Sequence, residues 1–210
     1  MRDTPTAKRL QRAQSLWEHD RAYEGFGVSL AGMDEAGRGA LIGDVVVGCV
    51  ILPAEPLMPW VDDSKKLSPE RREQVYEQIA ACALYVGVGS ASAEEIDEIN
   101  ILNATRLAMR RAAEKAPATL CLVDAVQGLG LPFPTQAIVH GDALSYSIAA
   151  ASIVAKVTRD RRMRELALCY PQYGLETHMG YGTSGHIAAI RQYGPCPLHR
   201  RSFLRNVRGD

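Results

Sequence analysis

Four carboxylates in this chain of 210 residues stand where buried strands are expected to end. Asp34 and Glu35 directly follow a first apolar run, and Asp124 closes a later one. Asp142 comes just after a third run and just before a long alanine-rich segment. A charged group at the end of a buried strand costs stability unless it is paired, caps a helix or binds a metal. These positions are therefore the first candidates for chemistry.

Carboxylates that converge repel one another, so one of them stays protonated or a cation neutralises the group. Hard oxygen ligands without histidine favour Mg²⁺ or Mn²⁺ over zinc. Two such ions about 4 Å apart form the clamp that enzymes use for phosphodiester cleavage. A metal site that serves phosphodiester cleavage is therefore one hypothesis for these four residues.

Each acid also has an ordinary structural interpretation. Asp142 could be the N-cap of the helix that follows it. Asp124 could be a turn residue before Ala125, and Asp34-Glu35 could be turn residues before Gly37. Residue types and spacing alone leave these alternatives open.

The elements that must position the acids follow the order of an α/β domain. Glycines at 37, 39 and 43 separate the first two apolar runs, which predicts an antiparallel hairpin with a wide turn. Ser68-Pro69 predicts a helix start, and Ser92 with Glu95 predicts a capping box. Strands followed by alternating helices and strands predict a mixed sheet covered by helices. Strands are expected over 28–33, 44–52, 84–91, 119–124 and 136–140, and helices over 68–83, 92–99, 100–115, 143–170 and 183–193.

The chain divides into an N-terminal extension, residues 1–26, and one domain, residues 27–210. The extension could form a helix with a weak apolar stripe made of Leu10, Ala13, Trp17 and Tyr23.

Overall composition says less about the class of protein than the positions of the four acids do. Lys plus Arg equals Asp plus Glu at 24 each, so net charge does not indicate a nucleic-acid partner. Five scattered cysteines without a C-x-x-C pair indicate free thiols in a reducing compartment. No run of about 20 apolar residues is available to span a bilayer. We therefore expect a cytoplasmic protein.

Eight blocks of sequence, in order, resemble the bacterial type 2 ribonucleases H, the ribonuclease HII family. The resemblance extends over residues 28–204. The blocks are Asp34-Glu35-Ala36-Gly37-Arg38-Gly39, Asp63-Ser64-Lys65-Lys66-Leu67-Ser68, Asn103-Ala104-Thr105 with Ala108-Met109, Leu122-Val123-Asp124, Gly141-Asp142, the stretch 149–161, Gly180-Tyr181-Gly182-Thr183 with His186, and His199-Arg200 with Ser202-Phe203.

The resemblance implies a ribonuclease H-like fold, a five-stranded mixed sheet flanked by helices. It also implies a catalytic metal site at Asp34, Glu35, Asp124 and Asp142, with two Mn²⁺ or Mg²⁺ ions. Our hypothesis is that Asp34 and Asp142 hold one ion, and that Glu35 and Asp124, with Asp34 shared, hold the other.

The implied activity is hydrolysis of the RNA strand of RNA–DNA hybrids and cleavage 5′ to single ribonucleotides embedded in duplex DNA. The ends would be 5′-phosphate and 3′-hydroxyl, and the enzyme is expected to be a monomer.

Substrate contacts are implied at two places near the acids. Gly37, Arg38 and Gly39 resemble the family's reader of the RNA-to-DNA junction, since glycines let the backbone approach a 2′-hydroxyl closely. Tyr181 resembles the tyrosine that packs on the deoxyribose after the ribonucleotide. Ordinary half-buried packing is the alternative for this tyrosine.

Phosphate contacts are implied at four further positions. Lys65 resembles a phosphate-binding lysine, and the amides around Ser64 could hold the same phosphate. Lys156 and Arg159 lie on the predicted long helix and could contact backbone phosphates.

The chain departs from the family pattern at several positions. Ala40 and Ile42 differ from the usual residues of the first block, and Asp44 replaces a proline and adds a negative charge near the metal hairpin. Ala125 follows the third acid where the family has glycine, which matters if the backbone there needs positive φ. Met179 stands where a lysine is usual.

Three other functions are less consistent with these residues. Another nuclease or an integrase of the same fold lacks the Gly37–Gly39 reader and the Tyr181 block. A nucleic-acid-binding protein without catalysis would not need all four acids. A P-loop or dinucleotide enzyme is disfavoured because neither glycine motif is present.

Overall fold

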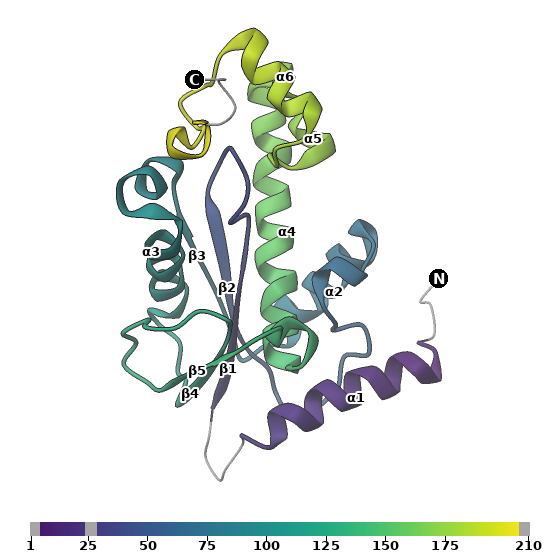
Figure 1. Ribbon diagram of the computed structural model, residues 1–210. Helices are drawn as coiled ribbons and strands as arrows, with labels where there is room; N and C mark the ends of the chain where they lie inside the picture. Colours follow the sequence, from purple (N-terminus) through teal and green to yellow (C-terminus); the bar gives the residue numbers. More distant parts are fainter. Residues whose placement is uncertain (1–4, 24–28, 206–210) are drawn as a thin grey trace.

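A five-stranded mixed sheet forms the centre of the computed structural model, which describes residues 5–23 and 29–205 (Figure 1). Its order is β3-β2-β1-β4-β5. The hairpin of β1 and β2 is antiparallel, as is the β2–β3 pair, whereas β4 runs parallel to both β1 and β5. This confirms the predicted mixed sheet and hairpin. The strands are β1 Leu30–Ala36, β2 Val45–Ile51, β3 Tyr85–Ala91, β4 Leu120–Asp124 and β5 Thr135–Ile138.

Helices cover both faces of the sheet (Figure 1). The long helix α4 packs on β1 and β2, and α3 packs on β2 and β3 from the opposite face. None of the helices in the described residues is long and apolar enough to cross a membrane. The α-helices are α1 Ala7–Arg21, α2 Pro69–Cys82, α3 Ala93–Ala113, α4 Tyr146–Cys169, α5 Leu175–His178 and α6 Ser184–Tyr193, and the 3₁₀ helices are η1 Ser64–Lys66, η2 Gly141–Ala143, η3 Pro171–Tyr173 and η4 Arg201–Phe203.

The apolar residues of β2 show how the layers form. Side chains of a strand alternate between its two faces. Val45, Val47 and Cys49 join the cluster under α3, while Val50 joins the cluster under α4, α1 and α2. A central strand that is buried on both faces reads as a continuous apolar run, which is why this strand was recognisable in the sequence.

Gly32 of β1 sets how closely α4 approaches the sheet. A Cβ atom at this position would lie 2.1 Å from the carbonyl carbon of Ser147, in the first turn of α4. The absence of a side chain therefore lets the start of α4 lie directly on β1. This contact also places the segment just before α4, which contains η2, near β1.

The first strand is longer than predicted. Strand β1 continues through Asp34 and Glu35 to Ala36, because the backbone of these residues still pairs with β2, for example Asp34 with Gly48. The two acids therefore belong to the strand itself rather than to the turn after it. The predicted start at Val28 lies outside the described residues.

Two predicted helix boundaries differ from the structure. The predicted helices over 92–99 and 100–115 join end to end in α3, where Asn100 has a non-helical backbone with φ of 64°. The long helix starts at Tyr146 and is capped by Ser145, whose side chain accepts from the amide of Ile148. The N-cap interpretation of Asp142 is therefore wrong, since this residue lies in η2.

The predicted N-terminal helix exists as α1, but its buried stripe differs from the one expected. Ala13 and Leu16 are buried in the cluster under α4, whereas Leu10 is exposed. Asp20 at the other end of α1 accepts a hydrogen bond of 2.7 Å from the backbone amide of Ser147. Residues 7–21 are thus packed as part of the domain that follows them.

The close contact at Gly32 gives a prediction for stability. Gly32→Ala should lower the free energy of unfolding by about 1–3 kcal/mol or more, because the new methyl group meets backbone atoms that cannot rotate away. Chemical denaturation of the purified protein measures this value. Gly185→Ala in α6 is the control, since its Cβ would meet no atom within 4 Å. Equal unfolding free energies for the two variants would contradict the account.

Candidate active site

The parallel pairing of β1 with β4 brings two of the four acids together. Met33 lies opposite Val123 in this pairing, so Asp34 and Asp124 follow at neighbouring positions. Asp34 is two residues after Gly32 and starts from the same face of the sheet, the face that α4 covers. The register of two strands thus determines the first half of the site.

The third acid joins the site through the turn before α4. The backbone amide of Gly141 donates to Oδ1 of Asp124 at 2.7 Å, which ties η2 to the end of β4. Asp142 follows directly and is buried. Its Oδ2 accepts from the ammonium of Lys65 at 3.0 Å. The site therefore combines the ends of β1 and β4 with two short 3₁₀ helices.

Glu35 approaches the same region from the opposite side of β1. Its Oε1 accepts from the guanidinium of Arg38 at 3.2 Å. Its Oε2 is buried and has no hydrogen-bond partner among the described residues. A buried carboxylate oxygen without a partner is costly, so binding a cation there would be favourable.

The acids repel one another, and burial strengthens the effect. Burial raises the pKa of Asp34 well above its usual value, and the charges of Glu35, Asp124 and Asp142 raise it further. Burial also raises the pKa of Glu35, although Arg38 opposes this shift. Burial raises the pKa of Asp124 against the hydrogen bond from Gly141. Each shift means that negative charge is disfavoured here without a cation.

The donor set fits a hard divalent cation, since Asp34 is coupled by charge to three other carboxylates and one of these, Glu35, has a buried oxygen without a partner among the described residues. Among the described residues, however, no three His, Cys, Asp or Glu side chains meet as a ready metal-binding group. The oxygens face Lys65, Arg38 and the Gly141 amide instead. Carboxylate side chains can rotate toward a cation, whereas the strand register that holds Asp34 beside Asp124 is fixed.

Gly37 opens the turn between β1 and β2 with φ of 93°. A Cβ atom here would lie 2.0 Å from Nε of Arg159. Arg159 is 1% exposed, and its guanidinium donates to the carbonyls of Asp44, Met179 and Ile42. Arg159 thus supports the turn through hydrogen bonds to backbone carbonyls. Because it is buried, it is not placed for the predicted phosphate contact.

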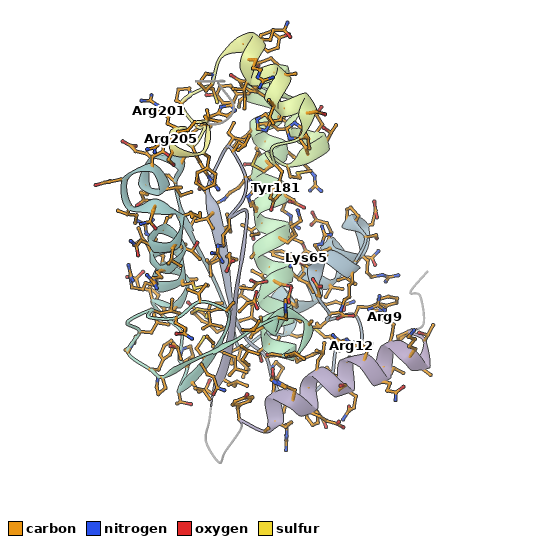
Figure 2. The ribbon with its side chains drawn as sticks, in the orientation of Figure 1. Arg9, Arg12, Lys65, Tyr181, Arg201 and Arg205 are labelled. Atoms are coloured by element: carbon orange, nitrogen blue, oxygen red, sulfur yellow. The ribbon has the colours of Figure 1, made fainter. Side chains whose placement is uncertain are left out.

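Tyr181 lies beside this turn and is 39% exposed. Its backbone pairs with Ala40 in an isolated bridge, and its ring lies 5.4 Å from the guanidinium carbon of Arg159. Figure 2 shows Tyr181 and Lys65 one above the other along α4. Gly39 is close by, since its Cβ would lie 4.0 Å from the ring. The structure therefore brings the tyrosine together with the glycine turn.

The other three residues predicted to contact phosphate differ in their exposure and in their distance from the acids. Lys65 is exposed although it contacts Asp142. Ser64 is buried, and its amide donates to the hydroxyl of Ser152 at 3.3 Å. Lys156 pairs with Asp160 at 2.7 Å, one turn along α4. Lys65 is the lysine of this group that lies directly at the acids.

Three departures from the family pattern now have a structural setting. Ala125 has φ of 51°, so the backbone after the third acid does adopt the conformation that glycine tolerates best. Met179 has φ of 48°, and its carbonyl accepts from Arg159. The carboxylate of Asp44 pairs with Arg162 at 3.0 Å, so its negative charge has a local partner.

Sequence reasoning missed several buried polar residues that support the site. Arg200 is fully buried and donates to the carbonyls of Gly43 and Arg38, so it holds the glycine turn together with Arg159. His186 and His199 are also buried, with their Nε2 atoms 3.2 Å apart. The presence of these residues in the seventh and eighth blocks indicated that they matter. The sequence gives no indication of the distant residues that they contact.

Comparison with known proteins shows the family of this chain. The family model described as Ribonuclease HII matches residues 31–206. Ribonuclease HII of Geobacillus kaustophilus is 54% identical over 196 residues, which cover 92% of this chain and 75% of the relative. Ribonuclease HII of Geobacter sulfurreducens is 52% identical over 182 residues, which cover 86% and 83%.

Solved structures share the fold. Ribonuclease H2 of Pyrococcus horikoshii has a TM-score of 0.70 at 28% identity, covering 86% of this chain and 97% of that one. Ribonuclease HII of Archaeoglobus fulgidus, in a complex with PCNA, has a TM-score of 0.71 at 25% identity, covering 85% and 96%. A ribonuclease HIII with bound Mn²⁺, Bst-RNase HIII, is 19% identical with a TM-score of 0.60, over 80% of this chain and 63% of that one. From its matched family model, its relatives and its fold, this chain belongs to the ribonuclease HII family of hydrolytic nucleases.

Proposed function

We propose that this enzyme hydrolyses the RNA strand of RNA–DNA hybrids and also nicks 5′ to single ribonucleotides in duplex DNA. The products would carry 5′-phosphate and 3′-hydroxyl ends. The observation that carries the proposal is the position of the four acids next to the Gly37–Gly39 turn and Tyr181. Membership of the family supports the activity on hybrids.

Asp34, Glu35, Asp124 and Asp142 are the residues that would hold two divalent cations, Mg²⁺ or Mn²⁺. When bound, the cations would supply Lewis-acid chemistry for phosphodiester hydrolysis. Their charge would also offset the repulsion that raises the pKa of Asp34. The Mn²⁺ complex of the distant ribonuclease HIII supports the choice of ion class.

Lys65 and Arg38 would act on the substrate side of the acids. Lys65 is 78% exposed at its side chain while it contacts Asp142. An exposed ammonium beside the acids is suited to hold a substrate phosphate, and the backbone at Ser64 would add to it. Arg38 is partly exposed and would balance the charge of Glu35 as the substrate arrives.

Recognition of the junction would rest on the backbone of Gly37, Arg38 and Gly39 and on the ring of Tyr181. A backbone without side chains at two of three positions can approach a 2′-hydroxyl, the group that separates RNA from DNA. The exposed ring would pack on the next sugar, where a ribose would fit poorly. Lys156 would contact a more distant phosphate, and Arg159 would keep the turn in shape.

The proposed setting is a monomer in the cytoplasm. The free cysteines support a reducing compartment, since the described structure contains no disulfide. The duplex substrate would lie across the face that carries Lys65 and Tyr181 (Figure 2).

Removal of one carboxylate tests the site. Asp34→Asn should lower turnover by more than the roughly 100-fold that outer partners of metal ligands cost. The metal-free variant should be at least as stable as the wild type, because a buried charge with three acidic neighbours has been removed. The assay is cleavage of a DNA duplex with one ribonucleotide, with Mg²⁺, Mn²⁺ or EDTA.

Glu98→Gln is the matched control, an exposed acid on α3 changed to its amide. It should cleave like the wild type. Near-normal turnover by Asp34→Asn, with EDTA still inhibiting, would exclude Asp34 from the metal site. If the wild-type enzyme cleaves long hybrids but does not nick at the single ribonucleotide, the proposed metal site is supported and the proposed role of Gly37–Gly39 at the junction is contradicted.

The ring of Tyr181 is tested by its own variants. Tyr181→Ala should lower cleavage at a single ribonucleotide by about tenfold, the scale of one aromatic contact to nucleic acid of roughly 1–3 kcal/mol. Tyr181→Phe keeps the ring over Arg159 and should retain most activity. Equal losses of cleavage and of duplex binding in Tyr181→Ala would argue against a specific role at the junction.

A further inference from the structure

We propose that the N-terminal helix α1 is a positioning element of the active site and that Arg12 is its main contact. The inference rests on the proposed roles of Asp142 and Lys65. It concerns a helix that precedes the matched family model, which begins at residue 31. Nothing in the shared blocks assigns a role to residues 7–21.

Arg12 reaches a buried carboxylate in the loop that leads to Lys65. Its Nε and Nη2 atoms both donate to Oδ1 of Asp62 at 3.2 Å. Arg9 donates to the other oxygen, Oδ2, at 3.0 Å. Asp62 is 4% exposed, and its Oδ1 also accepts from the backbone amide of Asp63. The conformation at the start of the Asp63–Lys65 segment is therefore fixed by an acid that α1 neutralises.

The same guanidinium also holds the turn that carries Asp142. Nη2 of Arg12 donates to the carbonyl of Ala143 at 2.7 Å. Ala143 follows Asp142, and Asp142 accepts from Lys65 at 3.0 Å. The contacts and the chain between them therefore close a ring, which runs from Arg12 to Asp62, along the backbone to Lys65, across to Asp142 and back through the carbonyl of the next residue. In Figure 2, Arg9 and Arg12 lie on α1 below Lys65.

Helix α1 is anchored well enough to fix the position of Arg12. Ala13 and Leu16 are buried under α4, together with Tyr146 and Val61. Asp20 accepts from the amide of Ser147 in the first turn of α4. Arg12 directly precedes the first of these anchors, Ala13, on a helix that cannot shift without breaking both contacts.

Arginine is suited to this place because its planar guanidinium binds two acceptors at once in a fixed geometry. Without it, Arg9 and Lys66 would still balance the charge of Asp62, the latter at 3.7 Å. The carbonyl of Ala143 would lose its link to that carboxylate. The loop with Lys65 and the turn with Asp142 would then move independently, so that both cation binding and phosphate binding would weaken.

The experiment uses the full chain with Arg12→Ala, Arg12→Lys and Gln14→Ala. Gln14 lies on the exposed side of α1, where it pairs with Glu18, and serves as the matched control. Cleavage of an RNA–DNA hybrid is measured as a function of Mg²⁺ concentration. Amide hydrogen exchange of the metal-free protein is followed over residues 62–66 and 141–145, and thermal unfolding reports the fold.

Arg12→Ala should raise the half-saturating Mg²⁺ concentration or lower kcat/KM by about 10- to 100-fold, the usual effect of removing a partner of a metal ligand. Exchange should become faster in both segments, and Gln14→Ala should change neither quantity. Arg12→Lys keeps a positive charge beside Asp62, so it should unfold close to the wild-type temperature and still show the shift in Mg²⁺ dependence. It remains informative if Arg12→Ala does not fold.

The inference is overturned if Arg12→Ala and Arg12→Lys match Gln14→Ala in Mg²⁺ dependence and in exchange. It is also overturned if exchange rises equally along all of α1 and activity falls only with the fraction unfolded. Asp142→Asn, assayed in parallel, separates this failure from failure of the proposed site. Normal turnover in Asp142→Asn contradicts the site itself, whereas loss of turnover in that variant alone contradicts only the role of Arg12.

Discussion

Repulsion among four carboxylates at one edge of a sheet is the constraint on which the rest of this structure depends. Asp34 feels the charges of Glu35, Asp124 and Asp142, and burial strengthens each of them. Two nearby positive groups partly offset this repulsion: the ammonium of Lys65 pairs with Asp142, and the guanidinium of Arg38 pairs with Glu35. These groups compensate only in part, because one buried oxygen of Glu35 has no partner among the described residues. A site of this kind favours divalent cations and anionic substrates together.

The substrate side of the site depends on buried arginines rather than on surface charge. Arg159 and Arg200 donate to carbonyls of the turn between β1 and β2, and this turn carries the proposed junction reader. Burial and the neighbouring charge of Arg159 together lower the pKa of Arg200 to about 10. Two buried cations under a glycine turn are costly, which is consistent with a functional demand on the shape of that turn.

The sequence predicted the strands, the hairpin and the positions of the acids, because buried strands and helix caps leave local patterns. It did not predict the contacts of Arg12 with Asp62 or of Arg159 with the β1–β2 turn. These pairs are separated by dozens of residues, and a surface-type residue gives no sign of its burial. The N-cap interpretation of Asp142 failed for a related reason: Ser145 is an equally good cap three residues later, and only the structure distinguishes them. The three segments that carry the four acids are brought together by the β1–β4 register and by the turn before α4, neither of which is a local pattern.

The most direct measurement of the central claim is anomalous scattering from crystals of this enzyme soaked in Mn²⁺. Our account predicts two anomalous peaks within ligand distance of the four carboxylates, one of them shared by Asp34 and Asp142. Movement of Lys65 away from Asp142 would accompany them. Ordered Mn²⁺ elsewhere in the crystal, with no peak near Asp34, would contradict the claim that these acids form the cation site.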